Sequence, residues 1–396
     1  MIENLPKPPF PDLMLLSKPT FFPDDKDKIF LAHCSVSRLL PDASEAICRF
    51  NSDQAEFGFE MFYKYGNVLT PFRNTAAELL KTGSQNLSFL TNTSEGMNMI
   101  ANGYPFQNGD SIISYIHEYP SNHYPWVLQK QKGVKLELLE NHTPPEFSLG
   151  AETMPGFFLV DELEKRISKN TRMICLSHVQ FTSGFAADLK QIGELCRQKG
   201  IDFIVDAAQS LGSMPLYPEE YGISAVAASG WKWLMGPIGT GILYTSPEFR
   251  EKIQNTMVGA DLMEQGQDYL NHNWAPLADG RRFEYSTRPL SHAVGLDRAM
   301  QSILKFTLEE VFQEILRLQD LLLSQISREL YLPMQFNENR SGILSFIPVK
   351  EISYVLENAK KKNLILTERG GFIRFAPHFY NTDDEILQAA DILNSI

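Results

Sequence analysis

Short apolar runs alternate with amphipathic stretches between about residues 85 and 245, and this alternation predicts a mostly parallel β-sheet covered by helices. Seven runs have the length and the apolar character of buried strands. They span residues 87–91, 111–115, 134–139, 172–179, 202–208, 225–229 and 241–245. Two helices are predicted between them, at 94–104 and 188–200, and Gly200 is well placed to end the second. The fold class is therefore α/β.

The pattern changes after about residue 265. Amphipathic stretches predict helices at 307–326, 352–361 and 383–396, and apolar runs predict strands at 343–347, 364–367 and 372–376. These elements indicate a smaller α+β domain. The first thirty residues contain six prolines and little periodicity, which is typical of an extended arm. We therefore expect an N-terminal arm (1–30), a large domain (31–265) and a small C-terminal domain (266–396).

Composition narrows the possible partners and surroundings. The chain has 396 residues, 43% of them hydrophobic, which is ample for a large core. Its net charge of −12 disfavours nucleic acid and anionic membrane surfaces as partners. No run approaches the ~20 apolar residues of a membrane span, and the N-terminus has no signal-peptide pattern. The four cysteines form no C-x-x-C pair, so we expect reduced thiols in a cytoplasmic protein.

Two segments carry the most informative chemistry, VDAAQS at 205–210 and SGWKWLMGP at 229–237. Asp206 ends one predicted strand, and ligands of parallel sheets bind beyond the carboxyl ends of the strands. Lys232 follows another strand and stands between two tryptophans, where burying an unpaired ammonium is costly. Each residue also fits a structural role, Asp206 as a helix cap and Lys232 as a lysine whose stem is buried at the surface.

Three other patterns are weaker. Ser229 and Lys232 have the S-x-x-K spacing of serine acyl-enzymes, but the S-D-N and K-T-G partners are missing from the sequence. The segment GPIGTG at 236–241 lacks the G-x-G-x-x-G pattern of dinucleotide sites. His117 and His123 do not form H-E-x-x-H, so we expect no metal site.

Several motifs occur in a fixed order between about residues 30 and 385: TNTSEGMN, EYPSNHYPW, SHVQFTSG, VDAAQS, SGWKWLMGP, FEYST and IRFAPHFYNT. On these motifs the chain resembles the class V aminotransferase group of fold-type I pyridoxal-phosphate (PLP) enzymes, which includes cysteine desulfurases, kynureninases and isopenicillin N epimerase-like proteins. The resemblance implies a fold-type I PLP transferase with a mostly parallel seven-stranded-type sheet between helices. It also implies PLP as the cofactor and an amino acid as the substrate.

The resemblance assigns four residues to the reactive ring of the cofactor. Lys232 matches the lysine that forms the Schiff base and later moves the proton at Cα. Asp206 matches the carboxylate that pairs with the pyridinium nitrogen, which lets the ring act as an electron sink. Gln209 matches the group that hydrogen-bonds the ring oxygen, and Tyr119 the residue that stacks on the ring.

The resemblance assigns other residues to the cofactor phosphate and to the substrate. Thr93 and Ser94 open a predicted helix, and free N–H groups at a helix N-terminus favour an anion. Ser229 and Trp231 match phosphate contacts, although desulfurases have histidine at the Trp231 position. Arg374 matches the arginine that grips the substrate carboxylate through two parallel hydrogen bonds.

Thr287 implies a partner subunit. It matches a threonine that reaches the phosphate of the neighbouring subunit, so the resemblance implies a homodimer with shared active sites. The family usually has glycine before this threonine, and Ser286 stands there in this chain. The local turn is therefore expected to differ.

The reaction remains open at this stage. The family begins with an external aldimine and a carbanion at Cα, which leads to epimerisation, amine transfer or cleavage at Cβ. Cysteine desulfurases of the group need a cysteine just before the arginine strand, and residues 363–372 contain none. The most similar subgroup is isopenicillin N epimerase-like, with a class V aminotransferase and a C–S or other β-lyase as near equals. A kynureninase is less favoured, and a non-catalytic PLP-fold binding protein is the last possibility.

Overall fold

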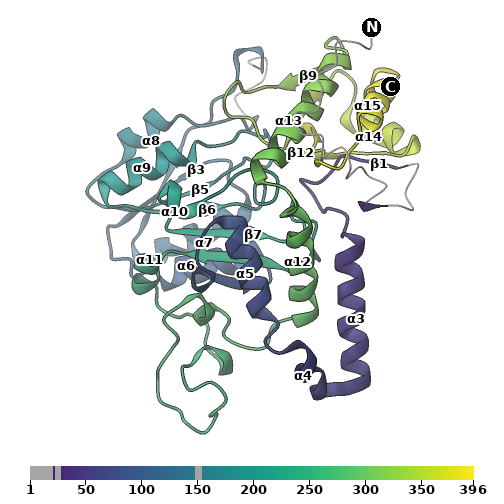
Figure 1. The fold of residues 1–396 in the computed structure, drawn as a ribbon. Helices are drawn as coiled ribbons and strands as arrows, with labels where there is room; N and C mark the ends of the chain where they lie inside the picture. The colour runs from purple at the N-terminus through teal and green to yellow at the C-terminus, as the bar shows by residue number, and fades with distance from the viewer. Residues whose placement is uncertain (1–20, 23–27, 148–153) are drawn as a thin grey trace.

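A seven-stranded sheet forms the centre of the computed structural model, which describes residues 21–22, 28–147 and 154–396 (Figure 1). Its strands are β2 (Leu87–Leu90), β3 (Ser111–Tyr115), β4 (Lys135–Leu139), β5 (Thr171–Ser177), β6 (Asp202–Asp206), β7 (Ala225–Ser229) and β8 (Gly241–Thr245). They lie in the order β2-β8-β7-β6-β5-β3-β4, and only β8 runs antiparallel to its neighbours. The predicted seven-stranded, mostly parallel α/β sheet is confirmed.

Helices cover both faces of this sheet. One face packs against α5 (Leu69–Leu80), α8 (Val160–Arg166), α9 (Leu189–Lys199) and α12 (Leu290–Ile303). The other face packs against α6 (Thr93–Gly103), α7 (Tyr124–Leu128) and α11 (Pro247–Lys252). Because successive side chains of a strand alternate, Val205 of β6 enters the first core and Ile204 enters the second. Strands buried on both faces explain the continuous apolar runs in the sequence.

A smaller antiparallel sheet lies near the C-terminus. It contains β9 (Tyr331–Met334), β10 (Leu344–Pro348), β12 (Thr367–Arg369) and β13 (Phe372–Phe375), in the order β12-β13-β10-β9. Its core is shared with α13 (Leu308–Gln325), α14 (Ile352–Lys361) and α15 (Asp383–Asn394). Capping boxes at Thr307 and Thr382 fix where α13 and α15 begin. The predicted α+β character is confirmed, while the domain boundaries stay a prediction.

The N-terminal segment pairs with strands of the C-terminal part of the chain. β1 (Ile29–Phe30) pairs in parallel with β11 (Leu364–Ile365), and Ala32 bridges Ala376. The backbone N–H of Ser37 then donates to the carbonyl of Trp231 at 2.9 Å, which brings residues 33–37 to the large sheet. Most of the predicted arm, residues 1–20 and 23–27, lies outside the described residues.

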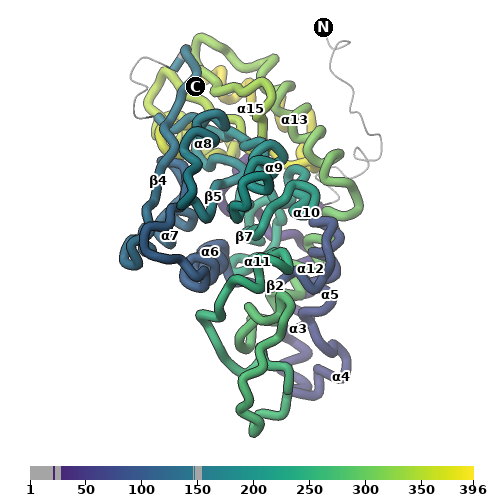
Figure 2. Tube along the Cα trace, turned by 90° about the vertical axis from the view of Figure 1, so that its left-hand side faces the viewer, coloured from purple at the N-terminus to yellow at the C-terminus, as the bar shows by residue number. Residues whose placement is uncertain are grey.

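The molecule is elongated in the view of Figure 2. The C-terminal elements lie at one end, and α4 (Phe62–Tyr65), which follows the long helix α3 (Pro41–Phe57), lies at the other. In the part of the chain that the structure describes, no helix is both long and apolar enough to cross a bilayer.

Candidate active site

The carboxyl ends of β2, β6 and β7 open onto a cavity of about 280 Å³. All the predicted site residues except Thr287 line it. They are Thr93, Ser94, Tyr119, Asp206, Gln209, Ser229, Trp231, Lys232 and Arg374. This position is the crevice in which open parallel sheets bind ligands. Residues scattered from 93 to 374 therefore form one site.

Lys232 lies three residues after the end of β7, is half-buried and lines this cavity. Its Nζ makes no hydrogen bond or ion pair with any described residue, and it lies 5.6 Å from the centroid of the Tyr119 ring. Burial lowers the pKa of the Lys232 ammonium, and the negative charge of Asp206 opposes this shift. A buried lysine with a lowered pKa has more of the neutral amine, which is the nucleophilic form.

Asp206 is the last residue of β6, Gln209 lies three residues later, and both line the cavity. Asp206 is 4% exposed, and its Oδ1 accepts from the backbone N–H of Ala208 at 2.9 Å. Burial raises the pKa of Asp206, while Lys232 lowers it. Gln209 Oε1 accepts from Trp233 Nε1 at 3.2 Å, and its Nε2 donates to the Cys34 carbonyl at 2.9 Å. One Nε2 hydrogen of Gln209 thus remains for a ligand.

The start of α6 supplies an anion site. Asn92 caps the helix by accepting from the Glu95 N–H at 2.8 Å. The hydroxyls of Thr93 and Ser229 are buried, and neither has a hydrogen-bond partner among the described residues. Leaving such a group unpaired costs about 1–3 kcal/mol, so both hydroxyls need a ligand. Two unpaired hydroxyls beside a helix N-terminus suit a phosphate group.

Arg374, on β13, also lines the cavity and belongs to the small C-terminal sheet. Its Nη1 donates to the Phe181 carbonyl at 2.7 Å and its Nη2 to Thr367 Oγ1 at 3.1 Å. The residue is only 2% exposed, and its Nε has no partner in the described structure. Burial lowers the pKa of the guanidinium. No described carboxylate pairs with it, so this buried cation lacks an anion that a substrate could provide.

Tyr119, Ser94 and Thr287 differ in how well their positions suit the cofactor contacts expected of them. Tyr119 is 43% exposed, and its ring packs edge-on against Phe181 at 5.1 Å between centroids. Ser94 Oγ already pairs with Ser121 Oγ at 2.7 Å. Thr287 is exposed and lies outside the cavity of its own chain. Its predicted phosphate contact is therefore not formed within one subunit.

Glu118 was missed in the sequence. It is buried directly before Tyr119, and its Oε1 accepts from the Ser177 N–H at 2.8 Å and from Gln180 Nε2 at 3.2 Å. Burial raises the pKa of Glu118 to about 7, and the nearby charge of Asp206 adds to this rise. Gln180 is therefore engaged with Glu118 and does not line the cavity, and neither does His178.

Cys34 and Arg369 were also missed, and both line the cavity. Cys34 enters from the N-terminal segment, and Arg369 ends β12. The only signal for Arg369 in the sequence is its position five residues before Arg374, and Cys34 lies in none of the motifs.

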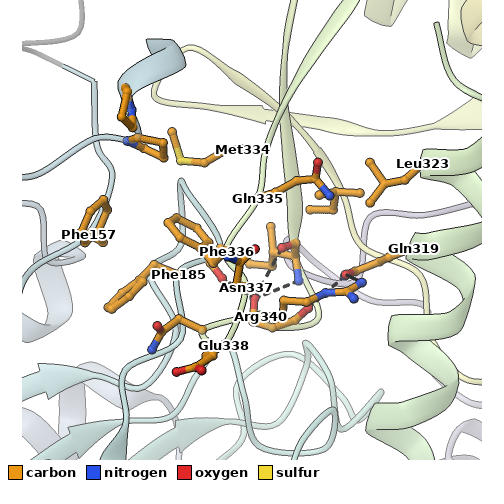
Figure 3. A pocket seen from close by; sticks show the side chains of 17 residues that line it. Phe157, Phe185, Gln319, Leu323, Met334, Gln335, Phe336, Asn337, Glu338 and Arg340 are labelled. Carbon is orange, nitrogen blue, oxygen red and sulfur yellow. Dashed lines mark hydrogen bonds between the residues drawn. The ribbon is translucent and has the colours of Figure 1, made fainter. Parts of the chain in front are cut away.

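A larger cleft of about 810 Å³ lies elsewhere, near β9 and α13 (Figure 3). Phe157, Phe185 and Phe336 form one wall of it. Of its described lining residues only Glu338 and Arg340 are charged, and Arg340 is paired with Asp320 at 2.7 Å. The smaller cavity holds Lys232, whose pKa is lowered, and the unpaired groups, so we assign the chemistry there. No cluster of metal-ligating side chains occurs in the described ranges.

Comparison with known proteins agrees with the geometry. The family model described as Aminotransferase class-V matches residues 50–386, so the chain belongs to this family and is a PLP-dependent enzyme. A probable cysteine desulfurase of Methanothermobacter thermautotrophicus is 25% identical over 89% of this chain and 90% of its own.

Two solved structures of one protein, C-DES, are also similar. A lysine-to-alanine variant with glycine covalently linked to the PLP cofactor has a TM-score of 0.83 at 22% identity, covering 95% of this chain and 99% of its own. The cystine C–S lyase C-DES with its product cysteine persulfide has a TM-score of 0.82 at 22% identity, covering 94% and 99%. These likenesses establish a shared fold. The buried unpaired hydroxyls, the isolated lysine and the buried carboxylate of the cavity all suit PLP.

Proposed function

We propose that the protein cleaves the Cβ–S bond of a sulfur-containing amino acid with PLP held at Lys232. The observation that carries the proposal is one cavity lined by the half-buried Lys232 and the buried Asp206 and Arg374, none of which forms an ion pair with a described residue. A cofactor with an aldehyde, a ring nitrogen and a phosphate, together with a substrate carboxylate, would satisfy all three residues and the two hydroxyls.

Six residues would hold the cofactor. Lys232 would bind it covalently, Asp206 would accept a hydrogen bond from its ring nitrogen, and Gln209 would donate to its ring oxygen. Tyr119 would stack on the ring. Thr93 and Ser229 would donate to the phosphate at the N-terminus of α6, where the helix dipole favours negative charge.

Lys232 and Arg374 would act on the substrate. When bound, PLP draws electrons from the Cα of an amino acid and so weakens its bonds. Arg374 would bind the carboxylate and orient the Cα–H bond. Lys232, displaced from the cofactor by the substrate amine, would accept this proton as a neutral base, since burial lowers its pKa. It would also return a proton to the product.

The relatives support sulfur chemistry over epimerisation. Their names describe a probable cysteine desulfurase and a cystine C–S lyase, and none of them supports the expected epimerase-like reaction. Amine transfer stays a second candidate, because a relative described as an uncharacterised aminotransferase, YcbU of Bacillus subtilis, is 24% identical over 93% of this chain.

We also propose a homodimer with shared active sites. Thr287 is exposed and outside its own cavity, which suits a contact with a partner's phosphate. Large apolar side chains are also exposed, including Phe59 and Tyr63 around α4 and Leu270 and Trp274 after α11. Figures 1 and 2 both draw α4 and the segment after α11 at the same end of the molecule. Apolar groups gathered at one end favour a protein interface.

The test is a screen of amino acids against the holoenzyme, with cysteine and cystine beside alanine, aspartate and kynurenine. From cysteine we expect either sulfide with pyruvate and ammonia, or alanine with the sulfur left as a persulfide. From cystine we expect cysteine persulfide with pyruvate and ammonia. Amine transfer to a keto acid without loss of sulfur would contradict the proposal and favour an aminotransferase. Exchange of the Cα proton in heavy water with no cleavage would favour an epimerase.

A further inference from the structure

Cys34 lies in the cofactor cavity, although it is distant in sequence from the other site residues. It is 1% exposed, and its carbonyl accepts from Gln209 Nε2 at 2.9 Å. Its Sγ lies 3.7 Å from Thr367 Oγ1. Cys34 is thus held between the residue proposed for the cofactor ring oxygen and the strand hairpin that carries Arg374.

The hydroxyl of Thr367 relates the thiol to Arg374. Thr367 Oγ1 accepts a hydrogen bond from Arg374 Nη2 at 3.1 Å, so its own hydrogen can point to the Cys34 sulfur. Cys34 also interacts electrostatically with both Lys232 and Arg374.

A second observation, independent of the thiol, indicates a ligand next to it. The Arg374 side chain is almost fully buried and lines the cavity, yet its Nε has no partner in the described part of the chain. No described carboxylate neutralises this guanidinium. An amino acid whose carboxylate binds Arg374 would therefore lie beside Cys34.

The other three cysteines, all in described parts of the chain, have different surroundings. Cys48 is exposed on α3, and Cys175 and Cys196 are buried in the cores on opposite faces of the large sheet. Of the four, Cys34 alone lines the cavity. The absence of a cysteine from residues 363–372 therefore does not leave the site without a thiol.

We propose that Cys34 is the sulfur acceptor of the reaction, taking the sulfur atom of a bound L-cysteine as a persulfide. This inference rests on the proposed C–S cleavage. The Cys34 sulfur forms a bond to the substrate sulfur as the substrate's Cβ–S bond breaks, and the electron pair of that bond remains on carbon. Two protons, one from each thiol, balance the step: one ends on Cβ and one on the new persulfide. The products are L-alanine and Cys34–S–SH, and no external oxidant or reductant is consumed.

The experiment treats the holoenzyme with L-cysteine, blocks the thiols with an alkylating agent, and maps the peptides by mass. We expect the peptide that contains Cys34 to be heavier by one sulfur atom and alanine to accumulate. Cys48→Ala, at an exposed position, is the matched control and should give the same result. Cys34→Ser should keep the visible absorption of the bound cofactor and lose both the added sulfur and the alanine.

The outcomes separate the two proposals. If the wild-type enzyme releases sulfide, pyruvate and ammonia while the Cys34 peptide stays unmodified, the role of Cys34 is overturned and C–S cleavage stands. If no sulfur-containing amino acid is cleaved, both proposals fail. If Cys34→Ser forms alanine at the wild-type rate, Cys34 is not the acceptor, even if the wild-type enzyme carries added sulfur on Cys34.

Discussion

The residues that line the active-site cavity form two groups, one proposed to bind the cofactor and one proposed to bind the substrate, and we refer to these groups as its two ends. They are built in different ways. The end proposed for the cofactor is formed by residues at or just beyond the carboxyl ends of strands of one sheet, such as Asp206 at the end of β6 and Lys232 shortly after β7. The end proposed for the substrate combines Cys34, from the N-terminal segment, with Arg369 and Arg374 of the small C-terminal sheet. The first end is part of a rigid parallel sheet, and the second is assembled from segments far apart in the chain.

This difference suggests a division of labour. A site on the strand ends of a buried sheet is held firmly in place, which suits a cofactor that stays bound through every turnover. Segments from a separate sheet can change in sequence without disturbing that sheet, which suits the choice of substrate. Mutations at the two ends should therefore affect different measurements, and the following predictions test that separation.

The largest effect is expected at Lys232, which serves both ends. Replacing it with alanine removes the covalent link and the general base, so kcat should fall by at least about 1,000-fold, within the range of lost acid–base catalysis. Lys190→Ala, which removes an exposed lysine paired with Glu220 at 2.7 Å, is the control and should keep full activity. Substantial activity in Lys232→Ala would show that another lysine holds the cofactor.

A smaller and more selective effect is expected at Arg374. Arg374→Ala removes the buried partner of the substrate carboxylate, which costs about 2–5 kcal/mol, so kcat/KM should fall about 100-fold, mainly through KM. The affinity for PLP should stay near the wild-type value. Arg340→Ala, in the other cleft, should change neither quantity. A parallel loss of PLP binding in Arg374→Ala would contradict the separation of the two ends.

A pH effect is expected beneath the cofactor end. Burial raises the pKa of Glu118 from 4.5 to about 7, so the folded protein binds this proton more tightly than the unfolded chain does. Stability from this group is present at low pH and is lost as the pH rises from about 4.5 to 7. Glutamine does not titrate, so Glu118→Gln should not show this loss. The free energy of unfolding of the variant minus that of the wild type should therefore increase by up to about 3 kcal/mol between pH 5 and 8. Urea unfolding of the cofactor-free proteins measures this, and parallel pH curves would refute it.

The smallest effect is expected at Thr287. Thr287→Ala should weaken PLP binding about tenfold, which corresponds to one hydrogen bond to a charged group. The variant should still sediment as a dimer, and Thr256→Ala, also at an exposed threonine, should bind PLP normally. Unchanged PLP affinity in Thr287→Ala would remove the support for a shared active site.

Among the residues that line the cavity, the sequence indicated Asp206 and Lys232 as well as Arg374, but not Cys34 or Arg369. Asp206 and Lys232 could be recognised because each follows a buried strand, and the carboxyl ends of parallel strands meet at one edge. Cys34 could not be recognised in this way. Its side-chain partner, Thr367, lies 333 residues later, and they meet only because β1 pairs with β11. Such a pairing of two-residue strands leaves no periodic signal in either segment.

The elements of the fold also differ in how well the sequence predicted them. The seven strands of the large sheet were predicted to within about two residues, because burial on both faces makes each a continuous apolar run. Helix α3 was not predicted. It buries only Ala43 and Phe50, so its apolar stripe is too sparse to give a clear helical period. Glu118 shows a further limit, since nothing local distinguishes a buried carboxylate from a solvated one.

The central claim is that Lys232 holds the cofactor, and chemical reduction of the holoenzyme tests it most directly. Borohydride fixes PLP to the lysine that carries it, and mass analysis of the peptides then identifies that residue. We predict a pyridoxyl group on the peptide that contains Trp231, Lys232 and Trp233. A pyridoxyl group on any other lysine, or no reducible link in a protein that binds PLP, would contradict the assignment.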